Sequence, residues 1–217
     1  MNILTKTQEK FLKLLGTYSF SQKFYLSGGT ALTEFYIPYR FSEDLDFFSE
    51  DEVQIDEIIA FLTKLKKQIG FKNYEYNTSF NRNLFFLTFP SETLKLEFTY
   101  YPFPPINIPK NEFGIKIDSI EDIAVNKLFT IYQKPRSRDF MDLFMIIKKY
   151  NFTIEDLIKK AKIKFDSHID PLKLGSQFFL AKELKDYPRL IDTLNDKEWQ
   201  NFFLEEAQKL GQEIIGK

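Results

Sequence analysis

The feature that most constrains the fold is the glycine pair Gly28-Gly29, which follows a short apolar run and opens a helix-like segment. Glycines at such a turn let backbone amide groups approach phosphate oxygens closely. Downstream, the alternating segment Asp44-Leu45-Asp46-Phe47 predicts a strand. Its period of two places both aspartates on one face and both apolar residues on the other. Two carboxylates downstream of a phosphate-binding turn indicate Mg²⁺ and a nucleoside triphosphate.

Composition limits which metal chemistry is available. The chain has 217 residues, no cysteine and a single histidine, His168, which we expect to be structural or exposed. This length suffices for one large domain or two small ones with a real core. The lack of Cys excludes disulfides and cysteine-ligated zinc, and one His excludes a histidine-rich metal site. Any metal is therefore expected on oxygen ligands. The formal net charge of -1 gives no indication of a nucleic-acid partner.

From the sequence we expect neither a membrane helix nor a secretion signal. The N-terminal residues are polar and lack the apolar core of a signal peptide, and no apolar run approaches the roughly 20 residues of a membrane helix. We expect a cytoplasmic protein with no membrane partner, which the lack of cysteine fits.

Hydrophobic periodicity predicts strands and helices mixed in the first half and helices alone in the second. The expected strands are 24–27, 44–49, 72–78, 83–89 and 93–101, and the expected helices are 3–16, 30–36, 54–69, 119–132, 138–150, 153–163, 172–185 and 195–214. The four prolines of residues 102–109 predict a loop or a sheet edge. Ser119 and Thr153 each begin an [ST]-x-x-[DE] helix-start signature. We therefore predict an α+β protein, with a mixed sheet and flanking helices in residues 1–118 and a helical domain in residues 119–217.

A third carboxylate is expected on the strand 93–101. Its period of two turns Lys95, Glu97 and Thr99 to one face and the apolar residues to the other. If this strand neighbours the acidic strand, Glu97 lies about 5 Å across the sheet and can share a metal. Taken singly, each feature has an ordinary explanation: a tight turn, a solvated strand edge or an exposed glutamate. Their order along the chain is more specific than any one of them.

Charge is distributed unevenly along the chain. Residues 41–60 hold eight acidic residues and no Lys or Arg, whereas residues 127–164 hold ten basic and four acidic residues. A triphosphate with Mg²⁺ could lie between such regions, and RNA is a plausible partner of the basic stretch. The alternative, favoured for residues 148–164, is a solvated helical face.

The ordered motifs resemble the nucleotidyltransferase superfamily of the polymerase-β type, and in particular the AbiEii-type family, the toxins of type IV toxin–antitoxin systems. The first motif comprises the segment 28–32 and the residues Arg40, Ser42 and Asp44 to Phe47. Lys127 matches a helical lysine of the family, and the segment Arg138 to Leu143 matches its R-D-x-x-D-L motif. These motifs span residues 26–143.

The resemblance implies a role for each matching residue. Asp44, Asp46 and Glu97 correspond to the ligands of Mg²⁺ (or Mn²⁺), and together with Lys127 they form the expected catalytic set. The expected nucleotide-binding residues are Gly28, Gly29, Thr30, Arg40, Ser42, Lys127, Arg138, Asp139 and Asp142.

Several of these residues have a second interpretation. Arg40 and Ser42 could orient the acidic strand instead of touching the nucleotide. Asp139 and Asp142 share a helical face, and Arg138 could pair with Asp142, four residues on. The alternative for this motif is a network of helix caps and ion pairs. Arg82 and Arg136 are weaker phosphate candidates.

The expected activity is transfer of a nucleoside monophosphate from an NTP to a tRNA 3′ end or a protein, with release of pyrophosphate. The resemblance implies a toxin or phage-defence (abortive infection) component, with a cognate antitoxin that need not bind it directly. Two alternatives remain: a non-catalytic nucleotide-binding regulator and a small-molecule nucleotidyltransferase.

Overall fold

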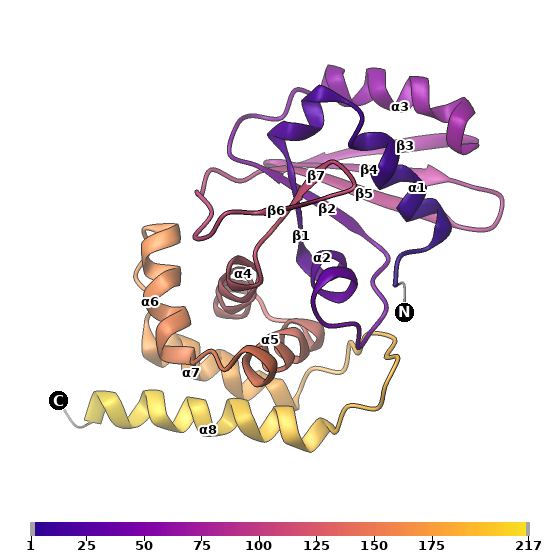
Figure 1. Cartoon of the computed structure of the whole chain (residues 1–217). Helices are drawn as coiled ribbons and strands as arrows, with labels where there is room; N and C mark the ends of the chain where they lie inside the picture. Colours follow the sequence, from indigo (N-terminus) through magenta and orange to yellow (C-terminus); the bar gives the residue numbers. More distant parts are fainter. Residues whose placement is uncertain (1–2, 216–217) are drawn as a thin grey trace. The chain divides into compact units, whose positions relative to one another are not determined.

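The computed structural model describes residues 3–215, which fold into two compact units (Figure 1). The first unit comprises Met1–Pro38 and Ser42–Ser119, and the second comprises Tyr39–Phe41 and Ile120–Lys217. Met1 and Asn2, which begin the polar N-terminal stretch, lie outside the described residues.

The first unit is built on a mixed sheet, whose described strands have the order β3-β4-β5-β2-β1-β7-β6. β2 runs parallel to β5 and antiparallel to β1, and β1 runs parallel to β7. The elements are α1 (Lys6–Leu15), β1 (Tyr25–Ser27), α2 (Gly28–Phe35), β2 (Leu45–Ser49), α3 (Ile55–Ile69), β3 (Asn73–Ser79), β4 (Arg82–Thr88), β5 (Thr93–Tyr100), β6 (Lys110–Glu112) and β7 (Ile115–Ile117). The predicted mixed sheet with flanking helices is confirmed.

Aromatic side chains fill the core between the sheet and the helices α1 and α3, which lie on one side of it (Figure 1). Phe47 of β2 stacks on Phe98 of β5, with ring centroids 5.0 Å apart. Phe11 of α1 contacts both Phe47 and Phe61 of α3. Burial of these large apolar rings supplies much of the driving force for folding. The apolar face of the acidic strand is thereby held inward.

Some elements differ from the sequence-based expectation. α2 begins at Gly28 instead of residue 30, so the glycine pair forms its first turn. The short hairpin β6–β7 and a 3₁₀ turn at Ser19–Lys23 were not predicted, because three to five residues carry too little periodicity. The helix expected over 172–185 ends at Phe179, where a tighter 3₁₀ turn, Leu180–Lys182, takes over.

The second unit is helical in its described part. Its elements are α4 (Ile120–Gln133), α5 (Ser137–Tyr150), α6 (Ile154–Phe165), α7 (Pro171–Phe179) and α8 (Asp196–Ile215). Phe203 of α8 packs against Phe140 of α5 and Phe178 of α7, with centroids 4.9 and 5.2 Å apart. The Thr153 hydroxyl accepts a hydrogen bond from the Asp156 N–H and caps α6, as its signature predicted.

The segment Tyr39–Phe41 belongs to the second unit, although it lies between α2 and β2 in the sequence. The Phe41 N–H donates to the Arg189 carbonyl, and the Ile191 N–H donates to the Tyr39 carbonyl, both at 2.9 Å. These bonds form a short antiparallel bridge around Arg40 and Leu190. Within residues 3–215, none of the helices combines the length and apolarity needed to cross a membrane.

Candidate functional site

The glycine turn at the start of α2 lies directly against a carboxylate. Gly28 has φ +71°, and a Cβ at this position would lie 2.6 Å from Oδ2 of Asp46. Only glycine therefore fits here without displacing the aspartate. Ser27, at the N-cap, does not cap the helix with its side chain, because its hydroxyl donates to Oδ2 of Asp118 at 2.6 Å. The first turn of α2 thus resembles a helix N-terminus that binds phosphate.

The acidic strand has the two faces that its period predicted. Leu45 and Phe47 are buried, whereas Asp46 is half-buried on the other face. In the antiparallel pair of β1 and β2, Asp46 lies opposite Ser27, and the Thr30 hydroxyl donates to the carbonyl of Asp44. The start of α2 and the acidic segment are therefore held together by backbone pairing and a side-chain bond.

Glu97 lies beside Asp46, as predicted. β2 and β5 are parallel neighbours, and their register places Asp46 opposite Glu97. Glu97 is buried, and the Thr99 hydroxyl donates to its Oε1 at 3.0 Å. The first unit thus places Asp46 and Glu97 on adjacent strands of one sheet, with Gly28 at the start of α2 against Asp46.

Asp44 and Glu97 are paired with basic side chains. Lys95 Nζ lies 2.7 Å from Oδ2 of Asp44. Arg82 binds both oxygens of Glu97, with Nε–Oε1 and Nη2–Oε2 distances of 2.6 Å. Burial alone would raise the pKa of Glu97, but the hydrogen bonds and charge of Arg82 outweigh it and hold that pKa below its usual value. The same hydrogen bonds raise the pKa of Arg82.

The donor atoms of this face suit a hard divalent cation. Carboxylate oxygens are the ligands that Mg²⁺ prefers, and the strand register sets two of them side by side. Among residues 3–215, no group of three or more His, Cys, Asp or Glu is arranged as a metal site. Asp44 and Glu97 have Lys95 and Arg82 as partners, so a bound cation would have to take the place of these contacts. The residue types suit Mg²⁺, and metal binding at this site stays a prediction.

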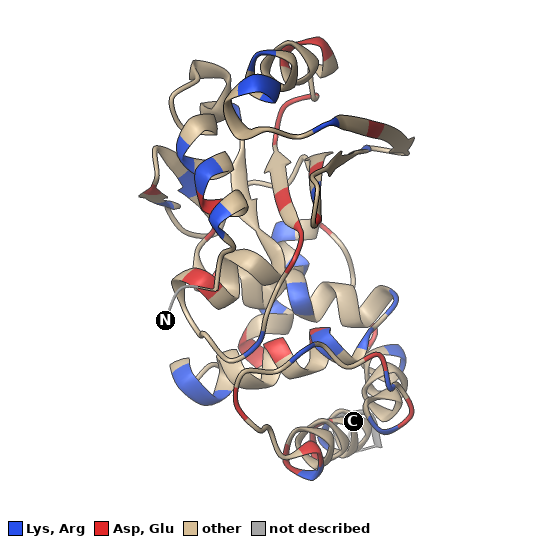
Figure 2. Ribbon diagram, turned by 90° about the vertical axis from the view of Figure 1, so that its right-hand side faces the viewer, with Lys and Arg blue, Asp and Glu red and all other residues tan. Residues whose placement is uncertain are grey.

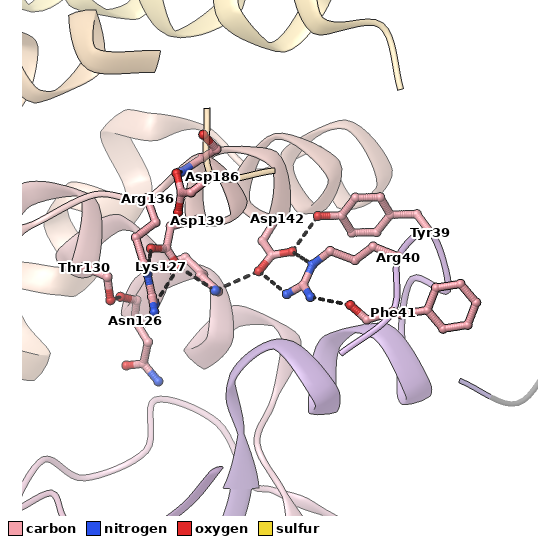
Figure 3. A network of polar contacts seen from close by, with 11 residues as sticks. Tyr39, Arg40, Phe41, Asn126, Lys127, Thr130, Arg136, Asp139, Asp142 and Asp186 are labelled. Carbon is pink, nitrogen blue, oxygen red and sulfur yellow. Dashed lines mark hydrogen bonds and ion pairs between the residues drawn. The ribbon is translucent and has the colours of Figure 1, made fainter. Parts of the chain in front are cut away.

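A second charged cluster lies in the helical unit, centred on Asp142 (Figure 3). Arg40 binds both carboxylate oxygens, with Nε–Oδ1 and Nη2–Oδ2 distances of 2.7 and 2.8 Å. Lys127 Nζ lies 2.7 Å from Oδ2 of Asp142 and 2.7 Å from Oδ1 of Asp139. The Tyr39 hydroxyl donates to Oδ1 of Asp142. We call Tyr39, Arg40, Lys127, Asp139 and Asp142 the Asp142 network.

Burial and neighbouring positive charges shift the pKa values of the two aspartates in this network in opposite directions. Desolvation would raise the pKa of Asp142, but Arg40 and Lys127 hold it well below its usual value. The pKa of Asp139 is also lowered against its burial, by Lys127 and by Arg136. Burial, followed by the charge of Asp142, raises the pKa of Tyr39 well above its usual value. Both aspartates are therefore ionised, and the cluster holds together by strong ion pairs.

The Asp142 network resolves several sequence-based expectations. It joins Arg40, Lys127, Asp139 and Asp142, which the motif analysis singled out separately. The expected pair between Arg138 and Asp142 does not form, because Asp142 is fully buried and faces Arg40 and Lys127. Among the described residues, Arg138 has no ion pair. Contact of these residues with a nucleotide stays a prediction.

The basic stretch 127–164 is less available than its sequence suggested. At least six of its ten basic residues form ion pairs with acidic side chains: Lys127, Arg136, Lys148, Lys159, Lys160 and Lys164. The pair of Lys164 with Asp122 is completely buried. Figure 2 likewise shows basic and acidic residues interspersed along these helices. Local pairing thus weakens the case for this stretch as an RNA-binding surface.

Sequence reasoning missed two residues that support the acidic strand. Gln8 of α1 is buried, and its Nε2 donates to the carbonyls of Ser42 and Glu43 at 3.3 and 3.0 Å. Lys95 was visible on the face of Glu97, but its pairing with Asp44 depends on the register of β2 and β5. No local signal distinguishes Gln8 from an ordinary helix-start residue, because it also completes the capping box of Thr5.

The glycine turn and neighbouring carboxylates on a mixed sheet are the features of a nucleotidyltransferase. A family model described as "Nucleotidyl transferase AbiEii toxin, Type IV TA system" matches residues 10–212. The chain belongs to this family. Membership implies a nucleotide substrate and a toxin–antitoxin context.

Individual relatives agree with this assignment. The chain is 31% identical over 168 residues to protein aq_aa25 of Aquifex aeolicus (strain VF5), covering 76% of this chain and 77% of that protein. Two solved structures from Helicobacter pylori have the same fold, each with a TM-score of 0.63 and 24% identity over 97% of this chain. One is provisionally titled a nucleotidyltransferase and is covered to 94%, and the other is JHP933, covered to 91%.

Proposed function

We propose that this protein transfers a nucleoside monophosphate from an NTP to an acceptor, the 3′ end of a tRNA or a protein hydroxyl, and releases pyrophosphate. The observation that carries the proposal is the contact of the glycine turn with Asp46, which lies opposite Glu97 on the next strand. A phosphate-binding helix N-terminus and two hard oxygen ligands on one sheet are what a metal-dependent phosphoryl site requires.

In this proposal Asp44, Asp46 and Glu97 hold Mg²⁺ or Mn²⁺. The metal, when bound, neutralises charge on the triphosphate and favours ionisation of the acceptor hydroxyl. The N–H groups at Gly28, Gly29 and Thr30 bind phosphate oxygens. The chain itself therefore supplies both the cradle for the phosphates and the anionic ligands.

Arg82 adds a basic side chain to the proposed site in the first unit. Arg82 binds Glu97 through two parallel N–H groups, and a phosphate accepts the same pair of bonds, so Arg82 can exchange one for the other. Lys127, a compact charge, is assigned to the triphosphate by family likeness, and within the helical unit Asp139 and Asp142 bind its ammonium group. Arg40 positions Asp142, and the remaining motif residues Ser42 and Arg138 are assigned to the nucleotide by family likeness alone.

The biological setting follows from the family. The description of the family model as a type IV toxin supports a toxin or phage-defence role for this chain, with a cognate antitoxin that need not bind it. Such a protein would act in the cytoplasm, where NTPs and both classes of acceptor are present.

The test is incubation with each labelled NTP, Mg²⁺ or Mn²⁺, and RNA or protein acceptors in parallel. We expect label transfer by the wild type, and a loss of roughly 10³-fold in rate for Asp46→Asn, because removal of a metal ligand costs several kcal/mol of transition-state stabilisation. Asp51→Asn, an exposed aspartate outside the site, serves as the matched control and should transfer normally. Equal transfer by Asp46→Asn, or no transfer by the wild type, would refute the proposal.

A non-catalytic nucleotide-binding regulator is the second candidate. The pairing of Asp44 with Lys95 and of Glu97 with Arg82 favours it, because these carboxylates already have cationic partners. It predicts that NTPs raise the melting temperature in the same assay mixture without forming any product.

A small-molecule nucleotidyltransferase would label neither RNA nor protein, yet would still release pyrophosphate with the right acceptor.

A further inference from the structure

The tip of the β3–β4 hairpin presents an aromatic side chain in a strained position. Phe80 has φ +52°, in the left-handed region that bulky residues rarely adopt. Its side chain is fully exposed, at 102% relative accessibility. A strained backbone and an apolar side chain in water both cost free energy, so contacts within the fold do not explain this residue.

The β6–β7 hairpin offers a direct comparison. Phe113 occupies the equivalent first position of its turn with φ +55°. Its ring packs against Phe35 at 6.2 Å, and Lys13 Nζ lies 5.6 Å from the ring centre. Packing therefore offsets the strain at Phe113. No ring or cation contact is found for Phe80 within the described chain.

Hydrogen bonds link the tip at Phe80 to the carboxylate face, by which we mean Asp44, Asp46, Arg82, Lys95 and Glu97. The Asn81 carbonyl accepts a hydrogen bond from the Tyr100 N–H of β5 at 3.0 Å. Arg82, two residues after Phe80, begins β4 and binds Glu97. From the spacing of strands and residues, Phe80 lies on the order of 15 Å from Asp46. All of these residues belong to the first unit.

The same sheet face continues from the carboxylates onto β4. The register places Leu84 opposite Glu97, and Phe86 opposite Lys95. Both side chains are only half-buried, so an apolar strip borders the charged residues. Aromatic residues on an open sheet are a recurring platform for stacked bases of single-stranded nucleic acid.

We propose that the Phe80 tip binds a single-stranded RNA acceptor by stacking one of its bases on the Phe80 ring. The role of the RNA as an acceptor rests on the proposed function, whereas the binding of RNA to Phe80 does not depend on it. A protein partner is disfavoured because Phe80 is a single fully exposed ring and Leu84 and Phe86 are half-buried, whereas protein interfaces bury about 800 Å² per partner around clustered apolar anchors. One ring beside a half-exposed arginine matches the size of a nucleotide instead.

The test measures binding of a fluorescent single-stranded RNA of about ten nucleotides by anisotropy, without NTP. We expect Phe80→Ala to weaken binding about 5- to 100-fold, the usual effect of losing one stacked base. Phe80→Trp should keep the affinity, and RNA should quench its added fluorescence. Ile108→Ala is the matched control, because Ile108 is 93% exposed in the same unit, and its affinity should equal that of the wild type.

Phe80→Gly separates binding from folding. Glycine adopts the left-handed backbone without strain, so this variant should melt no lower than the wild type and yet lose the same affinity. Wild-type affinity in the Ala and Gly variants would overturn the proposal. Absence of RNA binding by the wild-type protein would also overturn it. This includes the result that Phe80→Ala loses labelling of a protein acceptor while the wild type binds no RNA. Phe80-dependent RNA binding without any nucleotidyl transfer would refute the proposed function and leave this inference standing.

Discussion

The carboxylate face of the first unit and the Asp142 network of the second are built from the same residue types but differ in burial. In the first, the side chains of Asp44 and Lys95 are 31% and 25% exposed, and the buried Glu97 is paired with Arg82, which is 52% exposed. In the second, Asp142 is 0% exposed and Arg40 only 4%. The ion pairs have similar lengths in both places, so distance alone does not distinguish them.

Burial decides what each cluster can do. An exposed ion pair is worth little, because water and salt compete with both partners, so its members can change partners at small cost. A buried pair cannot exchange, because either charge left alone in the interior is strongly penalised. The carboxylate face is therefore suited to binding a ligand, whereas the Asp142 network is suited to holding helices and the Tyr39–Phe41 segment in place.

The largest expected loss of stability comes from removing Asp142, the central carboxylate of the buried Asp142 network. We expect Asp142→Ala to lower the free energy of unfolding by about 3–5 kcal/mol, since Arg40 and Lys127 would be left buried without this partner. For a chain of this length the melting temperature should fall by roughly 10 °C. Thermal and denaturant unfolding measure the effect.

The matched control is Asp156→Ala, at an exposed aspartate of α6 whose ion pair with Lys159 lies in solvent. Its effect should stay within about 0.5 kcal/mol. If Asp142→Ala were as mild as this control, burial would not be the property that separates the two clusters.

Acid should destabilise the folded protein through the two buried aspartates of the Asp142 network. Asp142 and Asp139 have lowered pKa values in the folded protein, so the unfolded chain binds protons more readily. Their stabilisation is full above the unfolded pKa and is lost as the pH falls through the folded values. We expect the free energy of unfolding to begin falling near pH 4, by on the order of 2 kcal/mol from this network.

Denaturant unfolding across a pH series measures this loss. Asp142→Asn should flatten the acid limb, because the group that titrates has been removed. Glu97→Gln should flatten it less, since Arg82, the partner that lowers the pKa of Glu97, is half exposed to water. An acid limb equally steep in Asp142→Asn and the wild type would argue against the role given to Asp142.

The smallest expected change in the free energy of unfolding comes from a substitution on the carboxylate face. Asp44→Asn removes the pair with Lys95 and should change the free energy of unfolding by no more than about 1 kcal/mol. Urea unfolding at neutral pH, next to Asp142→Ala, gives the comparison directly. A loss as large as that of Asp142→Ala would mean that the carboxylate face is a structural element and not a ligand site.

Local sequence patterns were enough to predict the parts of the site that lie within one element. The period of two placed Asp46 on the face opposite Leu45 and Phe47, because side chains alternate along any strand, whereas Asp44, expected in the strand, lies just before its first residue. The same alternation placed Lys95, Glu97 and Thr99 together. The glycine pair marked a turn that L side chains do not fit. Lys127 and the Arg138–Leu143 motif, in contrast, were identified by family likeness and not by their physics.

Only the tertiary structure decided which charges meet. Arg40 and Asp142 are 102 residues apart, and Lys95 and Asp44 are 51 apart, so no local period connects them. Strand register selects Lys95 for Asp44, and burial selects Arg40 and Lys127 over the nearer Arg138 for Asp142. A sequence therefore determines which residues share a face, because that depends on local geometry. Packing determines their partners and their exposure to solvent, and hence which cluster can exchange its contacts for a ligand.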